Sequence, residues 1–202
     1  MPLAVRRAVD LLVAVACLAV AGGAGAADVA ALESTARTAT QQLMQQIGGE
    51  LKREFALSGT LRSVVVCKYS APEVSSTVSK RYGAQVRRVS LRVRNPALGT
   101  PDPWEQRQLL DFDRRAASGE GAGGIEASEL VHEPAGWYYR YMKAIPVADI
   151  CLNCHGSADS LTAATSAQLA AEYPHDRAVG YQVGDIRGAV SYKILVDPEV
   201  AR

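Results

Sequence analysis

The sequence predicts a single α+β domain built around a mostly antiparallel sheet. Three segments, residues 88–94, 137–145 and 187–196, alternate apolar with polar side chains, which is typical of half-buried strands. Residues 28–57 place apolar side chains at steps of three and four, which is typical of an amphipathic helix. Strands and helices that follow each other without a regular βαβ order favour the α+β class. The 202 residues contain no internal repeat and no sign of a second domain.

The first half of the domain is expected to be largely helical. The long N-terminal helix should end at Ser58-Gly59, because glycine commonly terminates a helix. Residues 61–69 carry a run of β-branched side chains, so both helix and strand remain open there. A further helix is predicted over residues 72–82, because a proline suits its first turn and Gly83 can close it.

The second half supplies most of the sheet. Asp102 is a suitable N-cap for a helix over residues 103–117. Residues 126–133 are expected to form a strand that turns at Gly136 into the aromatic strand 137–145. A helix is predicted over residues 160–173, before the C-terminal strand.

The N-terminus is typical of an export signal. A basic pair, Arg6-Arg7, precedes an apolar run over residues 8–20, and Ala24-x-Ala26 follows as a small-residue cleavage signature. The apolar run is short for a membrane span. We therefore expect residues 1–26 to be a signal peptide cleaved near Ala26, and residues 27–202 to be a single periplasmic domain.

The charge balance points away from nucleic acid as a partner. The chain has 22 basic and 21 acidic side chains. Removal of residues 1–26 takes away two arginines and one aspartate, which leaves 20 of each sign and a net charge of zero. Nucleic-acid-binding domains normally present a basic surface.

The chemistry of the chain is concentrated in Cys151-Leu152-Asn153-Cys154-His155. This spacing is the attachment motif of a c-type haem. Two cysteines three positions apart lie about one helical turn from each other, so both sulfurs can reach the two vinyl groups of one porphyrin. A zinc site would need a second pair of ligands, which the sequence lacks, and a redox dithiol rarely has a histidine directly after it. We therefore expect one covalent haem c per chain, with Cys151 and Cys154 as thioether anchors and His155 as the proximal iron ligand.

The sixth iron ligand is open from the residues alone. The candidates are Cys67, His132, His175, Met44 and Met142. Both methionines have a simple core role, because each lies in or beside an apolar stripe. Cys67 has no disulfide partner once Cys151 and Cys154 hold haem, but a buried inert thiol would look the same. The choice lies between Cys67 and the two histidines.

Three arginines are candidates to pair with haem propionates, because a buried unpaired carboxylate is costly. They are Arg92, Arg94 and Arg187. Each could instead be an arginine on the solvated face of a strand.

Several short motifs together resemble the single-haem c-type domains with a PAS-like fold that were long catalogued as a domain of unknown function. The resemblance covers about residues 30–198. The motifs that carry it are Val65-Val66-Cys67 with Ala71-Pro72, Arg94-Asn95-Pro96, Pro101-Asp102-x-Trp104-Glu105, the Cys151–His155 site, and residues 184–191. The resemblance implies a PAS-like antiparallel sheet with a long N-terminal helix and flanking helices. It also implies histidine on one side of the iron and a cysteine thiolate on the other, which here would be Cys67.

The resemblance implies redox sensing or electron transfer through a single haem. We expect an unidentified redox or signalling protein as the partner, and the long N-terminal helix could support a homodimer. The alternative is a gas-binding haem sensor or a haem peroxidase, which needs an open sixth position on the iron. We expect no enzymatic activity, because no catalytic constellation other than the haem motif is visible in the sequence.

Overall fold

A computed structural model of the chain describes residues 24–201 and has the predicted α+β architecture. Its sheet has four strands in the order β1-β4-β3-β2, and every neighbouring pair is antiparallel. The strands are β1 (Gln85–Val89), β2 (Glu126–Glu133), β3 (Gly136–Pro146) and β4 (Ile186–Val196). Up to residue 23, the predicted signal peptide lies outside the described residues.

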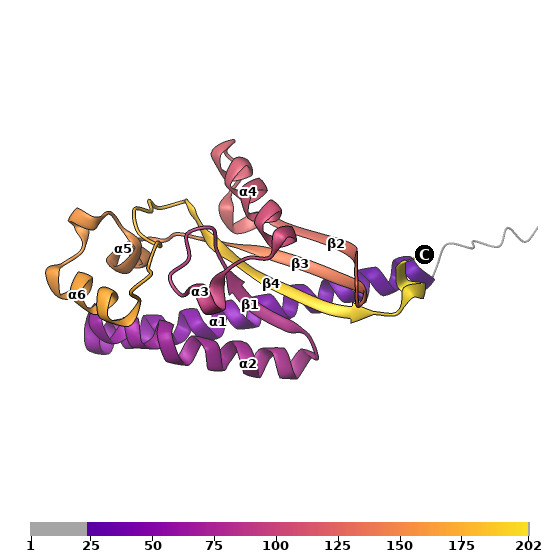
Figure 1. Cartoon of the computed structure of the whole chain (residues 1–202), viewed down its shortest axis with the longest axis horizontal. Helices are drawn as coiled ribbons and strands as arrows, with labels where there is room; N and C mark the ends of the chain where they lie inside the picture. Colours follow the sequence, from indigo (N-terminus) through magenta and orange to yellow (C-terminus); the bar gives the residue numbers. More distant parts are fainter. Residues whose placement is uncertain (1–23, 202) are drawn as a thin grey trace, which may run out of the picture.

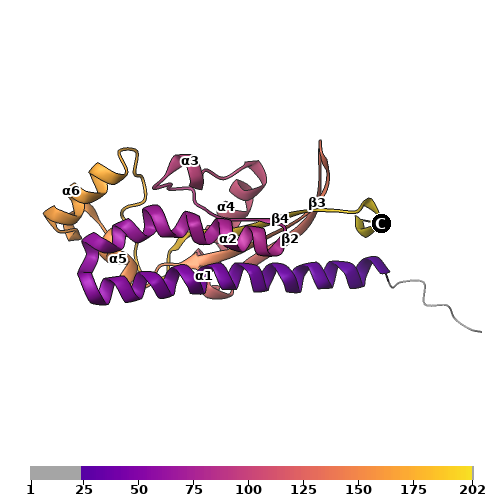
Figure 2. The same ribbon diagram turned by 90° about the horizontal axis from the view of Figure 1, so that it is seen from below.

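One face of the sheet is covered by a helical hairpin (Figures 1 and 2). Helix α1 (Ala24–Val65) runs along the sheet and is broken at Gly59, whose φ of 72° is non-helical, as the sequence predicted. The chain then returns through the π-helix η1 (Val66–Ser70) into α2 (Ala71–Tyr82). Gly83 closes α2 in the left-handed conformation, which confirms the predicted cap.

The opposite face is covered by α4 (Pro103–Ala117). Asp102 begins this helix in a capping box, in which its carboxylate accepts from the Glu105 N–H and the Glu105 carboxylate accepts from the Asp102 N–H. The predicted cap is therefore confirmed. The shorter elements are α3 (Pro96–Gly99) and the 3₁₀ turns η2 (Ala122–Gly124), η3 (Ala158–Ser160) and η4 (Pro198–Ala201).

The sheet is buried on both faces because its side chains alternate between the two helical layers. On β3, Tyr139 and Tyr141 pack against the α1–α2 hairpin, and Met142 and Ala144 pack against the α4 layer. All four are at most 1% exposed. The hydrophobic core thus consists of two apolar layers that sandwich the sheet.

The predicted strand over residues 88–94 is wrong in its bounds. Strand β1 ends at Val89, so Arg92 and Arg94 lie in the following loop. The reason is tertiary: a Cβ at Gly188 would lie 2.3 Å from the Val89 carbonyl oxygen, so β1 and β4 approach closely here. The Ser90 hydroxyl then donates to the Arg187 carbonyl at 2.8 Å, and the backbone turns away from the sheet.

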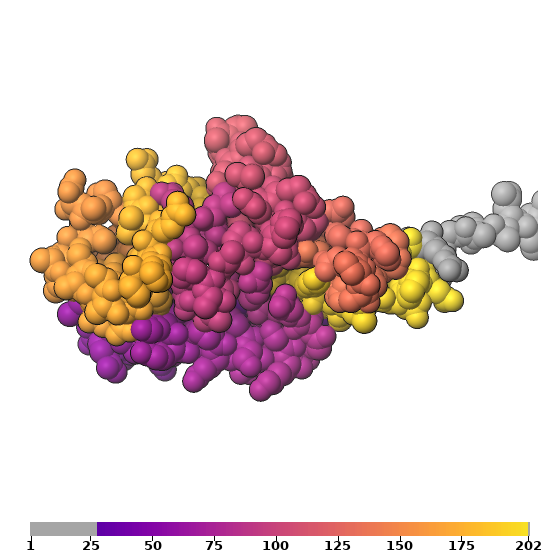
Figure 3. Space-filling view, viewed as in Figure 1, coloured from indigo at the N-terminus to yellow at the C-terminus, as the bar shows by residue number. Residues whose placement is uncertain are grey.

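Beyond the sheet, the chain forms a small lobe that we call the cysteine end. It comprises η1, α5 (Asp149–His155), α6 (Ala163–Glu172) and the loop of residues 173–185. Figures 1 and 3 show α5, α6 and this loop gathered at the end of the molecule where α1 turns back. Helix α6 begins after its N-cap Thr162 rather than at the predicted residue 160. Within residues 24–201, no helix combines the length and the apolar character needed to cross a membrane.

Candidate functional site

The Cys-x-x-Cys-His motif forms the short helix α5, which directly follows β3. Both cysteines are half-buried free thiols. Cys151 packs against a cluster of Val147, Ala178 and Tyr181. Cys154 packs against a second cluster, which contains Val64, Leu169 and Tyr173. The two thiols thus face apolar surroundings on neighbouring turns of one helix.

The geometry around His155 fixes which ring nitrogen carries the proton. Nδ1 lies 2.7 Å from the Ala178 carbonyl oxygen, which can only accept, so Nδ1 is the donor. Nε2 therefore holds the lone pair, and it accepts from Arg187 Nε at 3.3 Å. Burial and the charge of Arg187 hold the pKa of His155 well below its ordinary value. The imidazole is neutral, and Nε2, which accepts from Arg187 here, is the atom with a lone pair for a ligand bond.

The loop of residues 173–185 fastens the C-terminus of α5. The Gly180 N–H donates to the Gly156 carbonyl at 2.7 Å, and the Tyr181 N–H donates to the His155 carbonyl at 2.9 Å. Gly156 has no room for a side chain, because a Cβ there would lie 2.7 Å from the Leu152 carbonyl oxygen. The Tyr181 ring meets His155 edge-on, with 6.1 Å between ring centroids. These contacts hold the orientation of the histidine.

The structure brings Cys67 to the same lobe. Cys67 lies in η1 as a half-buried free thiol, and π-helical turns occur frequently at functional sites. Burial raises the pKa of Cys154 to about 11, the charge of Arg94 opposes this, and nearby Cys67 adds to it. Cys67 and Cys154 therefore share one electrostatic environment. The next residue, Lys68, ties η1 to α6 by donating to the Glu172 carboxylate at 2.6 Å.

The other candidate ligands are placed differently. His132 is exposed and pairs with Trp137 at the start of β3, whereas α5 follows the other end of that strand. His175 belongs to the cysteine end but is exposed. Met142 is fully buried in the α4 layer. Met44 lies on α1 and packs against the apolar cluster between the α1–α2 hairpin and the sheet. Of the five candidates, only Cys67 is a partly buried side chain in the cysteine end.

The three predicted arginines all reach the cysteine end, but their contacts differ. Arg187 lies against His155 and also donates to the Ser90 hydroxyl at 2.9 Å. Among the described residues, no carboxylate forms an ion pair with it. Arg92 stacks on the Tyr181 ring at 3.6 Å and donates to the Val179 carbonyl.

Arg94 is buried, and its hydrogen bonds to protein groups are made through Nη2. Its Nη2 donates to the carbonyl oxygens of Cys154 at 2.5 Å and Ala178 at 3.1 Å. Its Nε lies 3.0 Å from the Asp176 carboxylate in an ion pair. No motif in the sequence singles out Asp176 or Ala178. A backbone carbonyl has no signature in a sequence, and Asp176 lies 82 positions from Arg94 in the chain.

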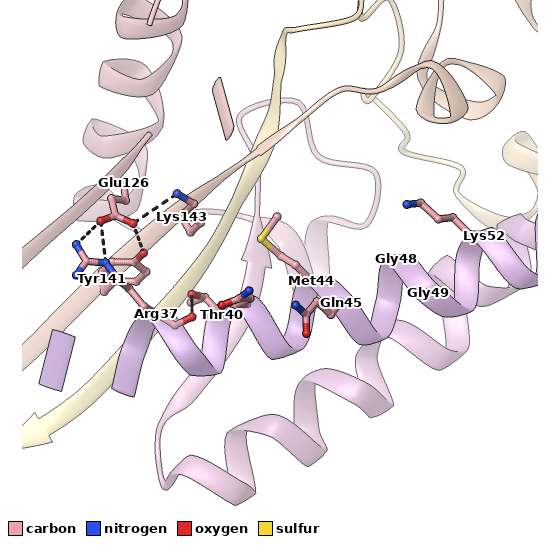
Figure 4. Close-up of a pocket in the computed structure, with 11 residues that line it drawn as sticks. Arg37, Thr40, Met44, Gln45, Gly48, Gly49, Lys52, Glu126, Tyr141 and Lys143 are labelled. Carbon is pink, nitrogen blue, oxygen red and sulfur yellow. Dashed lines mark hydrogen bonds and ion pairs between the residues drawn. The ribbon is translucent and has the colours of Figure 1, made fainter. Parts of the chain in front are cut away.

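Two grooves lie outside the motif. The first, of about 680 Å³, runs between α1 and the strands β2 and β3. Figure 4 shows Glu126 in this groove, where its carboxylate accepts from Arg37, Tyr141 and Lys143. The second, of about 640 Å³, is lined by Tyr181 and Arg92 and so reaches the side of the cysteine end.

The residues of the site do not form a multi-ligand metal cluster. Within residues 24–201, no three His, Cys, Asp or Glu side chains gather closely enough to hold a bare metal ion.

Fold and site together define an α+β protein that carries a single Cys-x-x-Cys-His helix at the end of an antiparallel sheet. The chain belongs to the Tll0287-like family, whose model matches residues 26–194. Among solved structures, the chain is similar to one described as the crystal structure of the cyanobacterial heme-protein Tll0287. The TM-score is 0.59 at 23% identity, over 85% of this chain and 96% of that one. The comparison with curated proteins found no significant match.

Proposed function

We propose that the protein binds one haem c through Cys151, Cys154 and His155 and acts in redox sensing or electron transfer in the periplasm. The observation that carries the proposal is the state of His155. Its Nδ1–H is held by the Ala178 carbonyl, so that Nε2 is left as the ligand atom. The similarity to a cyanobacterial haem protein supports the same cofactor.

The residues present fit a haem group. Two half-buried thiols stand on one helix with the neutral imidazole directly after them. Arg187 is a half-buried guanidinium that no carboxylate neutralises among residues 24–201, and it lies against the imidazole. Such a cation calls for an anionic partner, and a propionate would supply one. Apolar clusters around both thiols suit the porphyrin faces.

When bound, haem iron supplies a reversible one-electron ferric–ferrous couple. The chain's own residues then have separate roles. Cys151 and Cys154 would anchor the ring, and His155 would bind the iron through Nε2. The Arg187 side chain would leave Nε2 and turn to a propionate. Arg92, stacked on Tyr181, is positioned beside the same edge.

We further propose Cys67 as the sixth ligand. It is the partly buried candidate in the cysteine end, and it lies in a π-helical turn that Lys68 ties to α6. A thiolate ligand favours ferric iron, so the reduction potential should lie below that of a His/Met site. Cys67 would bind ferric iron as a thiolate, and its proton affinity would be higher when the iron is ferrous. A sensor needs such a difference between two states.

The haem proposal is tested by expressing the chain where c-type maturation operates and separating it on a denaturing gel stained for haem. We expect the parent and Cys67→Ser to retain covalent haem, and Cys154→Ala to lose at least one thioether link. Colour that washes out of the parent in acid acetone would overturn the covalent attachment.

The role of Cys67 is tested by electron paramagnetic resonance and redox titration of Cys67→Ser, with His175→Gln as the control. We expect a changed ferric spectrum and a higher potential in Cys67→Ser alone. An unchanged spectrum would make Cys67 a packing residue. A parent that is high-spin and binds carbon monoxide readily would favour the gas-sensor or peroxidase alternative.

A further inference from the structure

The buried guanidinium of Arg94 lies behind the proximal histidine rather than at the surface. Its side chain is 8% exposed. One of its nitrogens, Nη2, donates to two carbonyl oxygens, those of Cys154 and Ala178. The Ala178 oxygen is also the acceptor of the His155 Nδ1–H bond. Arg94 and His155 thus donate to the same oxygen atom.

Asp176 holds the same residue, Ala178, through its N–H. The Asp176 Oδ1 accepts from the Ala178 N–H at 2.7 Å, and its Oδ2 lies 3.0 Å from Arg94 Nε. One carboxylate therefore accepts from the N–H of Ala178 and also neutralises the cation that donates to the Ala178 carbonyl. Because Asp176 is also largely buried, with a side chain 11% exposed, solvent screens the pair only weakly.

From this arrangement we propose that Arg94 and Asp176 are positioning residues that set the electron donation of His155 to the iron. The inference rests on the proposed haem function. A carbonyl oxygen that accepts from a charged donor has less electron density for its second donor. Arg94 therefore weakens the His155 Nδ1–H bond, and the imidazole is a poorer electron donor as a result. Asp176 partly offsets the charge of Arg94.

The two residues should act on the reduction potential with opposite signs. Loss of the Arg94 charge strengthens the Nδ1–H bond, raises the basicity of His155 and favours ferric iron. Loss of the Asp176 charge leaves Arg94 uncompensated and favours ferrous iron. A purely structural role would loosen the backbone at Ala178 in either variant and move the potential in one direction.

The experiment compares Arg94→Gln, Asp176→Asn and the control Arg177→Gln in the haem-loaded protein, by mediated redox titration at one pH. The electrode supplies the single electron. Asn keeps an Oδ1 acceptor for Ala178, and Arg177 is an exposed arginine of the same loop. We expect the ferric-to-ferrous ratio at fixed potential to rise about tenfold in Arg94→Gln and to fall in Asp176→Asn. Tenfold corresponds to about 59 mV for a one-electron couple. Arg177→Gln should stay near the parent.

A second readout follows the hydrogen bond itself. In the reduced protein, the His155 Nδ1–H proton resonance should move downfield in Arg94→Gln, and Arg94→Lys should restore part of both shifts. Potentials that move in the same direction in both variants, or not at all, would overturn the inference. So would a potential that moves while the Nδ1–H resonance stays fixed, since the charge would then act through space alone.

The failure of this inference differs from that of the proposed function. If the chain holds no haem, the parent is colourless and has no potential to titrate. If only the inference fails, the parent is red, and Arg94→Gln and Asp176→Asn do not shift its reduction potential in opposite directions. If Arg94→Gln does not incorporate haem, Asp176→Asn and Arg94→Lys still test the direction in which the reduction potential shifts.

Discussion

The sheet region, which comprises the four strands, the α1–α2 hairpin and α4, is held together by different forces from the cysteine end. The sheet region contains two apolar clusters of twelve and nine buried residues, one against each face. The cysteine end contains two clusters of only three buried residues each. Its loop is instead fastened by backbone hydrogen bonds to α5 and by the Arg94–Asp176 ion pair.

If the chain binds haem as proposed, the stability of the two regions should depend on the cofactor to different degrees. Burial of apolar area stabilises the sheet region whatever the cysteine end holds. The cysteine end has little apolar core of its own, and a bound porphyrin would extend both of its clusters. We therefore expect the sheet region to provide most of the stability and the cysteine end to provide the response to the cofactor.

The largest expected effect on the free energy of unfolding comes from truncating a core side chain, and one truncation in each region allows the comparison. Phe112→Ala removes a fully buried ring from the α4 layer and should cost about 4 kcal/mol of unfolding free energy. Leu169→Ala, in a three-residue cluster, should cost about 2 kcal/mol, because its surroundings can collapse more easily. Urea denaturation of both variants measures the difference. Equal losses would mean that the cysteine end is as tightly packed as the sheet.

A smaller effect compares the N-caps of two helices. Asp102→Ala removes the cap of α4 and also an ion pair to Arg140, which is 3% exposed, so we expect a loss of about 2 kcal/mol. Thr162→Ala removes the cap of α6, where the hydroxyl accepts from the Thr165 N–H, and should cost about 1 kcal/mol. Thermal unfolding of both variants measures this. The reverse order would contradict the comparison.

Local signals in the sequence were enough to predict much of the sheet region. Asp102 and Gly83 form the predicted caps, because capping depends on residues within one turn of the helix end. The bounds of β1 could not be predicted, because the strand ends where Gly188, 99 positions after Val89, lets the two backbones meet. Alternation alone does not reveal that contact.

The candidate site likewise contains residues that could be predicted from the sequence and residues that could not. The ligand motif is local, so its spacing indicates three site residues directly. The acceptor of the His155 Nδ1–H bond is a backbone carbonyl 23 positions away, and any residue type supplies a carbonyl. The contacts of Arg94 also depend on the loop that carries Asp176. Only the folded chain reveals these groups.

The contact between Lys68 of η1 and Glu172 of α6 offers a more direct test of the cysteine end. Lys68 donates to both the backbone carbonyl and the carboxylate of Glu172. Lys68→Met keeps the length of the side chain and removes both bonds, so we expect η1 and α6 to open more often than in the parent. Faster hydrogen exchange should appear in η1 and α6, with β3 unchanged. Exchange that rises equally in β3 would show that the two regions unfold as one unit.

The smallest expected effect concerns the contribution of charge to the stability of the sheet region. The Arg37 hydrogen bond, helped by Tyr141, lowers the pKa of Glu126 from 4.5 to about 2 against the opposing effect of burial. Because the folded pKa lies below the unfolded one, this contact stabilises the fold fully above about pH 4.5, and the contribution is lost as the pH falls toward 2. Arg37 is half exposed, so we expect on the order of 1 kcal/mol. Urea denaturation from pH 6 to pH 3 should show a weaker pH dependence in Glu126→Gln, whereas the control Glu120→Gln, at an exposed ion pair, should follow the parent. If Glu126→Gln follows the parent as well, the contacts of Glu126 with Arg37, Tyr141 and Lys143 contribute nothing measurable to the free energy of unfolding. Helix α1 would then be held to the sheet by apolar contact alone.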